Sequence, residues 1–255
     1  MISVVVVYNN EQTLNEILLQ SLKNQTSKFE IIPVDNTKGR FKSAAEALNY
    51  GGKRANGRYI MFVHQDVDLV SPTWLENVEK ILEPIHDLGI AGIVGMSEKG
   101  WHFKKRWRGY IEDNVNIYSR NKTLQNPEEV QTLDGLLLII PKLMFDKMQF
   151  DEKTFDGWHC YDADYCLRVR QFGLKAYAIP FFVRHGSFGG NIKDIFEYQR
   201  RLYYKHKKNH RHIYTTCREI SFLTIKLHPI VEKHIPFKVR LLVNWLFNKI
   251  SRCLK

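Results

Sequence analysis

The chain has 255 residues, 44% of them hydrophobic, and a net charge of +11. This composition is typical of a globular protein and excludes a disordered or fibrous one, and the length allows one large domain with an appendage. The four Cys residues are too few for a disulfide scaffold and lack the CxxC spacing of a metal site.

The positive charge is concentrated at the C-terminal end. Residues 1–192 hold 23 Lys and Arg against 23 Asp and Glu, whereas residues 193–255 hold 15 against 4. We therefore expect a neutral body followed by a basic segment. Such a segment favours an anionic partner, which includes nucleic acid, a phosphorylated substrate or an anionic membrane.

The first hundred residues alternate predicted strands and helices. A β-branched run at residues 2–7 is typical of a strand buried on both faces, and apolar residues at helical spacing follow from Thr13. A strand at 29–34, a helix around 44–48 and a strand at 59–63 complete a βαβαβ order. This order predicts a parallel sheet with right-handed crossovers.

The later elements are less regular. Ser71 and Pro72 predict the start of a helix that continues to Leu82. Residues 99–132 are polar and aromatic with weak periodicity, and we expect a long loop over the site there. The other predicted elements are strands at 90–94, 136–140 and 176–179 and a helix at 162–172.

Polar residues follow the first three predicted strands. Tyr8 and Asn9 follow the first strand, Asp35 follows the second, and His64 and Asp66 follow the third. In a parallel sheet the carboxyl ends of the strands meet at one edge, where ligands bind. These side chains can therefore converge on one ligand.

The segment from His64 to Asp68 carries an imidazole and two carboxylates at alternating positions. In an extended chain His64, Asp66 and Asp68 would point to one side. Mg²⁺ and Mn²⁺ are often held by one or two carboxylates together with substrate phosphates. His185, after a later strand, is a further candidate ligand. A solvated acidic turn and a purely structural histidine are the alternatives.

A second acidic pair, Asp162 and Asp164, stands at the start of a predicted helix, where the helix dipole favours anions. A carboxylate there can act as a general base on a substrate hydroxyl within hydrogen-bond reach. Ordinary helix capping is the alternative. The spacing from Asp164 to Arg168 also fits a simple ion pair along the helix.

Several common nucleotide and hydrolase motifs are missing. No GxGxxG follows the first strand, Gly52 and Lys53 lack the rest of a P-loop, and there is no GxSxG. The sequence therefore argues against a dinucleotide-dependent enzyme, a P-loop nucleotidase and an α/β-hydrolase.

Residues 2–190 resemble the family 2 glycosyltransferases of the GT-A fold, through five short motifs in the family's order. The motifs are the first strand with Tyr8-Asn9, Val34-Asp35-Asn36-Thr37, the stretch 47–66, Asp134-Gly135-Leu136 with 150–152, and Tyr161-Asp162-Ala163-Asp164 with Leu167-Arg168. Two positions depart from the family pattern. His64 stands where the first Asp of the DxD motif is usual, and Tyr161 replaces the Glu before the base.

The resemblance implies an α/β protein of GT-A type, with a Rossmann-like, mostly parallel sheet flanked by helices and a basic helical C-terminal extension. The catalytic domain would span 1–192, with a nucleotide-sugar half at about 1–98 and an acceptor half at about 99–192. The basic segment would span 193–255.

The resemblance also implies an inverting glycosyltransferase. It would move a sugar from a nucleotide sugar to a hydroxyl of a glycan or lipid-linked acceptor, and Asp35 favours a UDP- or dTDP-sugar. The expected residues are Asp162 as base; Tyr8, Asn9, Asp35, Asn49 and Asp66 for the donor; Asp66, with Asp68 or His64, and His185 for Mn²⁺ or Mg²⁺; and Asp134, Trp158 and Asp164 on the acceptor side.

The basic segment adds a candidate membrane contact. Residues 237–255 project as an amphipathic helix with a basic polar face, which fits an anionic membrane surface or packing on its own domain. Basic and aromatic residues alternate at 200–208, as in nucleic-acid binders, but the acidic motifs make nucleic acid an unlikely partner.

The start of the chain lacks a signal-peptide pattern, and no apolar run reaches the roughly 18 residues of a membrane span. We therefore expect a cytoplasmic protein, peripheral on the inner face of the cell membrane if the amphipathic helix binds there. Two alternative functions remain: a nucleotidyltransferase of related fold, and a non-catalytic adaptor that acts through the basic segment.

Overall fold

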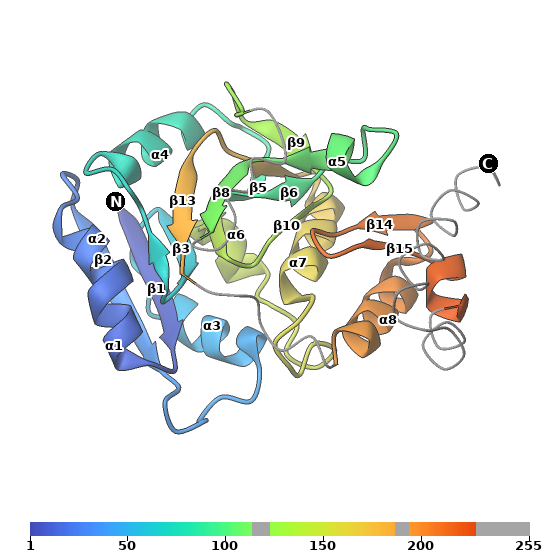
Figure 1. Cartoon of the computed structure of the whole chain (residues 1–255), viewed down its shortest axis with the longest axis horizontal. Helices are drawn as coiled ribbons and strands as arrows, with labels where there is room; N and C mark the ends of the chain where they lie inside the picture. Colours follow the sequence, from blue (N-terminus) through green and yellow to red (C-terminus); the bar gives the residue numbers. More distant parts are fainter. Residues whose placement is uncertain (114–122, 187–193, 228–255) are drawn as a thin grey trace.

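The computed structural model describes residues 1–113, 123–186 and 194–227 (Figure 1). Its centre is a seven-stranded sheet in the order β2-β1-β3-β11-β5-β12-β9. The strands are β1 (Ile2–Tyr8), β2 (Phe29–Asp35), β3 (Tyr59–His64), β5 (Leu88–Gly92), β9 (Glu128–Val130), β11 (Leu137–Pro141) and β12 (Lys175–Ala178). Only β11 and β9 run against the others. The mostly parallel sheet of the predicted α/β fold is confirmed.

Alternation of side chains along β1 builds a core on each face of the sheet. Val4 and Val6 share a core with η1 (Leu14–Leu18), α2 and α4, whereas Val5 shares one with α3, α6 and α7, and all three are fully buried. The helices are α1 (Glu11–Thr13), α2 (Leu19–Lys23), α3 (Ala44–Gly52), α4 (Trp74–Leu82), α6 (Lys142–Lys147) and α7 (Tyr161–Val169). Burial on both faces explains why this strand is an unbroken β-branched run.

Two helices begin at other residues than predicted. The first begins at Glu11 rather than Thr13, because the Asn10 side chain accepts a hydrogen bond from the Thr13 N–H at 3.0 Å and caps it. Its middle, η1 (Leu14–Leu18), is a π-helix. The helix expected from Ser71 begins at Trp74, because the Ser71 side chain instead accepts a bond from Thr73 N within a turn.

The prediction of a long loop at 99–132 is wrong for the described part of that range. This part contains α5 (Phe103–Arg106), β7 (Trp107–Arg108), β8 (Tyr110–Asp113), β9 and the start of β10 (Thr132–Leu133). Strands from elsewhere in the chain, β6 (Gly95–Met96), β4 (Val67–Asp68) and β13 (Phe182–His185), complete two three-stranded sheets with them, β10-β6-β7 and β4-β13-β8. Strands of two to four residues leave too little periodicity to be recognised in a sequence.

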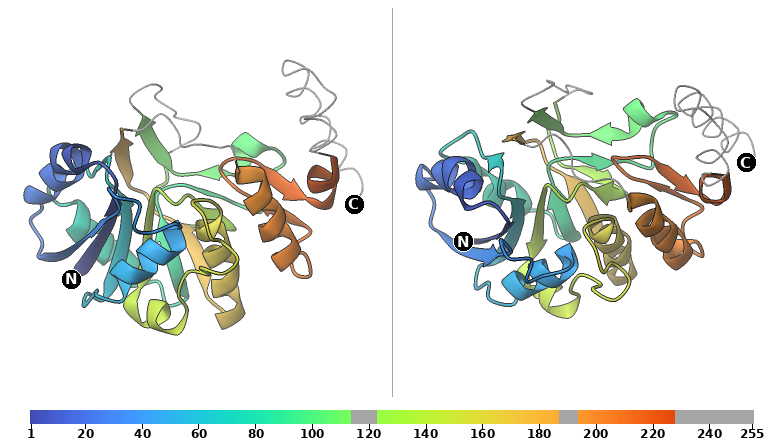
Figure 2. Two further views of the ribbon diagram at one scale, coloured as in Figure 1. Left: turned by 90° about the horizontal axis from the view of Figure 1, so that it is seen from below. Right: turned by 60° about the horizontal axis from the view of Figure 1, so that its bottom comes forward.

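Residues 194–227 pack against the rest of the chain rather than standing apart from it. In the views of Figure 2, α8 (Ile195–His206) lies beside α7, and β14 (His212–Tyr214) pairs with β15 (Glu219–Ser221). Leu202 and Ile213 are fully buried in the same core as α7. The described part of the basic segment therefore continues the body beyond residue 192, while the amphipathic helix predicted at 237–255 lies outside the described residues.

Basic side chains of α8 pair with carboxylates of the body. Arg201 Nη1 lies 2.7 Å from an Asp156 oxygen, and Lys205 Nζ lies 2.6 Å from an Asp151 oxygen. Burial acts to raise the pKa of Asp151, but hydrogen bonds from Lys205 and Thr154 lower it well below its usual range. These pairs place part of the predicted basic stretch in contact with the protein itself, which weighs against nucleic acid as its ligand.

Across the described residues, no helix combines the length and the apolarity needed to cross a membrane.

Candidate active site

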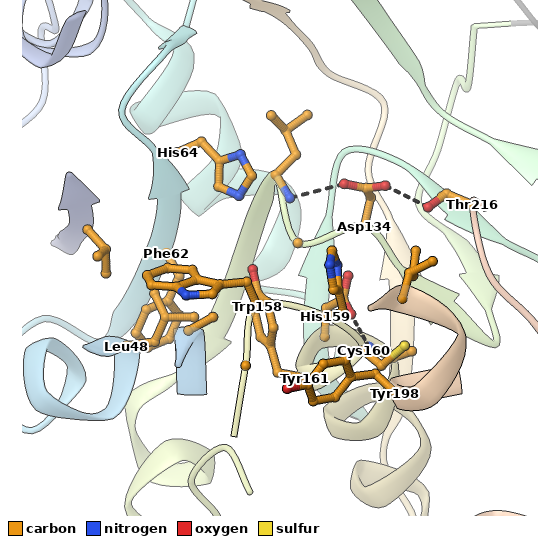
Figure 3. A pocket seen from close by; sticks show the side chains of 18 of the residues that line it. Leu48, Phe62, His64, Asp134, Trp158, His159, Cys160, Tyr161, Tyr198 and Thr216 are labelled. Carbon is orange, nitrogen blue, oxygen red and sulfur yellow. Dashed lines mark hydrogen bonds between the residues drawn. The ribbon is translucent and has the colours of Figure 1, made fainter. Parts of the chain in front are cut away.

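The carboxyl ends of β1 and β3 open into a cleft of about 1240 Å³ (Figure 3). The loop before α7, the start of α8 and the turn between β14 and β15 form the other side. The predicted site residues that line this cleft are Tyr8, Asn9, His64, Asp66, Asp134, Trp158, Asp162 and His185. The four that do not line it are Asp35, Asn49, Asp68 and Asp164.

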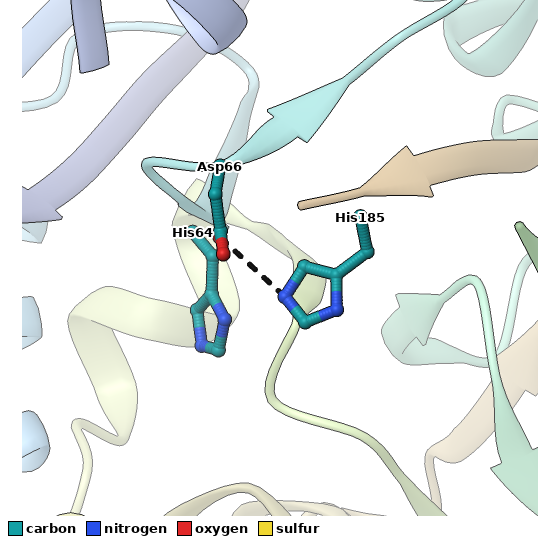
Figure 4. Close-up of side chains that lie close together, drawn as sticks. All are labelled: His64, Asp66 and His185. Carbon is teal, nitrogen blue, oxygen red and sulfur yellow. Dashed lines mark ion pairs between the residues drawn. The ribbon is translucent and has the colours of Figure 1, made fainter. Parts of the chain in front are cut away.

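His64, Asp66 and His185 form a cluster at the edge of the sheet (Figure 4). One potential ligand atom from each lies within 4.8 Å of those of the other two. The Nε2 atom of His185 is 3.4 Å from an Asp66 carboxylate oxygen, and the two imidazole rings are 5.8 Å apart. His64 ends β3, Asp66 follows in the turn, and the neighbouring strand β13 brings in His185.

The surroundings favour the protonation states that bind a metal ion. Desolvation by the surrounding protein lowers the pKa of His64, although its ring is exposed to the cleft, and this favours the neutral imidazole. Burial acts to raise the pKa of Asp66, but the hydrogen bond from His185, together with the charge of the histidines when they are protonated, lowers it overall. Neutral imidazole and ionised carboxylate are the ligand forms, so the donor set fits a divalent cation.

Asp68 does not join this cluster, which corrects one of the two predicted ligand sets. The prediction assumed an extended chain from His64 to Asp68, but the chain turns at Gln65 and Asp66 and resumes as β4. Pairing of β4 with β13 then directs Asp68 to Arg184, with 3.6 Å between the charged atoms. Asp68 lines a second, smaller cavity of about 390 Å³, which Asp66 and His185 also line from their other side.

Two predicted donor-binding residues also lie outside the cleft lining. Asn49 is 2% exposed, and its amide donates to the Phe150 carbonyl at 2.9 Å and accepts from the Phe150 N–H at 3.0 Å. Its polar atoms are therefore used inside the protein, and we withdraw it from the donor site. Asp35 is exposed beside Tyr8 at the end of the sheet, where hydrogen bonds from Thr37 lower its pKa. Asp35 therefore lies at the same edge of the sheet as Tyr8, but it does not line the cleft.

Gln65 is a cleft residue that sequence reasoning missed. Its side-chain oxygen accepts hydrogen bonds from the backbone N–H groups of Asn9 and Asn10, both at 3.0 Å, and its nitrogen donates to the Asn9 side chain at 2.7 Å. Gln65 thereby fastens the end of β1 to the turn that carries Asp66. Its position between His64 and Asp66 is the sequence feature that could have identified it.

Asp162 lies in the first turn of α7, half-buried in the cleft wall. It follows Cys160, which has a left-handed backbone (φ +64°) that turns the chain into the helix. One carboxylate oxygen accepts a hydrogen bond from Ala163 N at 2.8 Å. Burial, and then the negative charge of Asp134, raise the pKa of Asp162 to about 7. A carboxylate with this pKa exchanges protons near neutral pH.

Asp134 is held in place from two sides, as Figure 3 shows. One oxygen accepts a bond from Leu136 N at 3.2 Å, and the other accepts from the Thr216 hydroxyl at 2.6 Å. Thr216 comes from the turn between β14 and β15, beyond the predicted catalytic domain. Nothing in its local sequence marks it as a site residue, so it was missed.

Asp164 is an anchor for α8 rather than an acceptor-side residue, which corrects its predicted role. It is completely buried and lies 2.7 Å from Lys205 Nζ, 2.7 Å from His206 Nε2 and 3.2 Å from Arg168 Nη1. The predicted helix pair with Arg168 is present. Residues two apart on a helix face different directions, so Asp164 points into the core while Asp162 lines the cleft.

Trp158 is on the loop before α7 and is 47% exposed in the cleft. The neighbouring Gly157 carbonyl accepts a hydrogen bond from Ala44 N at the start of α3, at 3.0 Å. The loop thus connects α3 with α7 and holds a large aromatic side chain in the cleft (Figure 3).

Known proteins resemble this chain in sequence or in fold. The chain is 27% identical over 192 residues to the Fuscovulum blasticum protein "ATP synthase subunits region ORF 6", which covers 72% of this chain and 74% of the relative. Among solved structures, S. aureus TarS 1–349 has a TM-score of 0.54 at 15% identity over 80% of this chain. GalNAc-T7 with UDP, GalNAc and Mn²⁺ has a TM-score of 0.57 at 15% identity, also over 80% of this chain.

A third structure extends over almost the whole chain. The mannosyltransferase PcManGT from Pyrobaculum calidifontis, in complex with GDP-Man and Mn²⁺, has a TM-score of 0.56 at 13% identity over 99% of this chain and 73% of its own. This chain spans 64% of the TarS chain and 47% of the GalNAc-T7 chain. At these identities the structures establish the GT-A fold.

The family model gives the more specific result. A model described as "Glycosyltransferase like family" matches residues 3–185, which include β1, the His64–Asp66–His185 cluster and Asp162. With a match over most of its length and the GT-A fold, the chain belongs to this glycosyltransferase-like family.

Proposed function

We propose that the protein transfers a sugar from a nucleotide-sugar donor to an acceptor hydroxyl by an inverting displacement. One observation carries the proposal. A single cleft holds a cluster suited to a divalent cation, formed by His64, Asp66 and His185, and a carboxylate, Asp162, whose pKa is raised to about 7. A base with this pKa accepts a hydroxyl proton efficiently at neutral pH.

The donor would bind at the strand ends. Tyr8 and Asn9 line the cleft there, and Asp35 offers a carboxylate to the N–H of a uracil or thymine ring, which favours a UDP- or dTDP-sugar. The names of related structures mention UDP-GlcNAc for TarS and GDP-Man for PcManGT. The fold therefore accepts more than one base, and the preference for UDP or dTDP rests on Asp35.

His64, Asp66 and His185 would hold the divalent cation. Two imidazoles with one carboxylate favour Mn²⁺ over Mg²⁺, because Mg²⁺ prefers a set made of oxygen ligands. The related structures of GalNAc-T7 and PcManGT are described with Mn²⁺. When bound, the cation neutralises diphosphate charge and stabilises the leaving group.

Asp162 would act as the base in the displacement. It accepts the proton of the acceptor hydroxyl while that oxygen attacks the anomeric carbon from the side opposite the nucleotide. The bond from the anomeric carbon to the diphosphate breaks, and a nucleoside diphosphate leaves with the electron pair. Asp134 supports this role because its charge helps to keep the pKa of Asp162 near neutrality.

The test compares wild type with Asp162→Asn. The variant should bind UDP-sugar and Mn²⁺ as wild type does and lose sugar transfer, because an amide does not accept the proton. Retained transfer would remove Asp162 as base. The released product separates the two enzyme classes: a glycosyltransferase releases nucleoside diphosphate, and a nucleotidyltransferase releases pyrophosphate or consumes it.

The acceptor would be a glycan or a lipid-linked sugar, presented at an anionic membrane to which the basic C-terminal residues bind. Residues 194–227 belong to the folded body, so the informative truncation removes only 228–255. It should abolish binding to vesicles with anionic lipid and leave donor binding intact. Vesicle binding by the truncated chain would contradict the membrane role. A full chain that binds vesicles but no nucleotide sugar, and loses vesicle binding on truncation, would favour an adaptor that acts through the tail.

A further inference from the structure

Gln199 on α8 has a buried side-chain oxygen for which the described residues provide no hydrogen-bond partner. The residue is 1% exposed and lines the cleft. Leaving such a group unpaired costs about 1–3 kcal/mol, so buried amide oxygens are paired in the great majority of cases. An unpaired acceptor in the wall of a cleft indicates a ligand that brings a donor, such as a hydroxyl group.

Gln199 belongs to a part of the cleft that the family match does not cover. The match ends at residue 185, whereas α8 adds Tyr198 and Gln199, and the β14–β15 turn adds Thr216. We call these three residues, with Trp158 and His159 on the loop before α7, the acceptor wall. Most of this wall therefore lies beyond the residues that the family model matches.

The loop and the helix of this wall are fastened to each other. The Tyr198 hydroxyl donates to an Asp156 oxygen at 3.2 Å, and Arg201 donates to the same oxygen at 2.7 Å and to the Thr154 carbonyl at 3.0 Å. These bonds hold the loop that carries Trp158. An exposed aromatic ring on a rigid loop provides a flat apolar surface, and carbohydrate rings present apolar C–H faces of matching size.

The charge of the cleft selects among sugars. Asp134 and Asp162 line it on the side of the acceptor wall, and Asp156, which also lines it, is paired with Arg201. In the described part of the chain, Lys42 is the single Lys or Arg of the lining, and it lies near the start of α3. A carboxylate or phosphate on the incoming sugar would meet like charge there, which is unfavourable.

We propose that the acceptor wall is the binding subsite for an uncharged, hydroxyl-bearing sugar unit of the acceptor. Trp158 packs against the ring of that sugar, and Gln199 accepts a hydrogen bond from one of its hydroxyls. The subsite rests on the proposed function, because a second hydroxyl of the same sugar must reach Asp162 for transfer.

The experiment uses p-nitrophenyl glycosides as probes, with the full chain saturated with UDP and Mn²⁺. Neutral glucoside, galactoside and mannoside are compared with the matched glucuronide and galacturonide by saturation-transfer NMR and titration. At least one neutral glycoside should bind, and its uronide partner should bind tenfold or more weakly. Gln199→Leu and Trp158→Ala should each weaken binding of the neutral probe about tenfold, the effect of one buried hydrogen bond or stacking contact.

Trp101→Ala is the matched control, because Trp101 is 73% exposed and does not line the cleft. This variant should bind the neutral glycoside with the same affinity as wild type. Equal affinity for neutral and uronide probes, or unchanged affinity in Gln199→Leu with an unchanged melting temperature, would overturn the subsite. So would the absence of glycoside binding in a chain that binds UDP and Mn²⁺. If UDP with Mn²⁺ does not bind to wild type at all, the proposed function fails, and the subsite with it.

Discussion

Replacing Asp162 with Asn should make the protein more stable at alkaline pH while removing transfer. The folded protein raises the pKa of this carboxyl from 3.8 to about 7, so it holds the proton more tightly than the unfolded chain does. The stabilisation from the bound proton is fully present below pH ~4 and is lost as pH rises through 7. Asn carries no charge and avoids this loss.

The structure sets the size of the effect. A shift of about three pKa units corresponds to about 4 kcal/mol at most. Asp162 is half-buried, so solvent screening reduces this, and we expect a gain of about 2 kcal/mol for Asp162→Asn at pH 8.5. For a chain of this length, that gain raises the melting temperature by roughly 4–8 °C. At pH 4 the variant and wild type should have nearly the same melting temperature.

The assay is urea and thermal unfolding of wild type and variant from pH 4 to 8.5, without nucleotide or metal. Asp164→Asn is the control, because the buried Asp164 carboxylate lies within ion-pair distance of Arg168 and Lys205. Breaking a buried ion pair costs about 3–5 kcal/mol, so this variant should be less stable than wild type at pH 8.5. An Asp162→Asn protein no more stable than wild type at pH 8.5 would refute the buried, proton-holding environment assigned to Asp162.

Further outcomes follow from the same geometry. Asp134→Asn should shift the rising limb of the pH–activity profile to lower pH, because it removes a charge that raises the pKa of Asp162; an unchanged limb would exclude that coupling. His185→Ala should remove the increase in melting temperature that Mn²⁺ causes, whereas Asp68→Asn should keep it; the reverse result would restore Asp68 as the ligand. Asn49→Ala should lower stability by about 3 kcal/mol in urea unfolding, through two lost buried hydrogen bonds, and leave the UDP affinity of the folded enzyme unchanged; a selective loss of UDP affinity would return it to the donor site.

Local patterns were sufficient for the first half of the fold and for part of the site. The β-branched run of β1 and the strand–turn–helix sequence that follows it predicted the parallel edge with Tyr8, Asn9 and Asp66. Asp162 could be selected because its place at a helix start is visible in the sequence. Each of these positions depends on neighbours within a few residues.

The errors come from contacts between distant parts of the chain. The sequence predicts Asn49 in the donor site, but the Phe150 backbone, 101 residues away, uses its amide. Asp68 leaves the cluster because β4 pairs with β13 instead of continuing β3. Thr216 reaches Asp134 across 82 residues through the packing of the β14–β15 hairpin. Such pairings follow from tertiary packing and have no local signature in a single sequence.

The central claim is that one cleft binds a nucleotide sugar together with a divalent cation. It is tested most directly by the melting temperature of the full chain with a panel of UDP-, dTDP- and GDP-sugars, with and without Mn²⁺. A ligand at 100 times its Kd adds about 2.7 kcal/mol, so at least one nucleotide sugar should raise the melting temperature by roughly 5–10 °C in the presence of Mn²⁺ and by much less without it. A panel in which no nucleotide sugar changes the melting temperature, with or without Mn²⁺, would contradict the account.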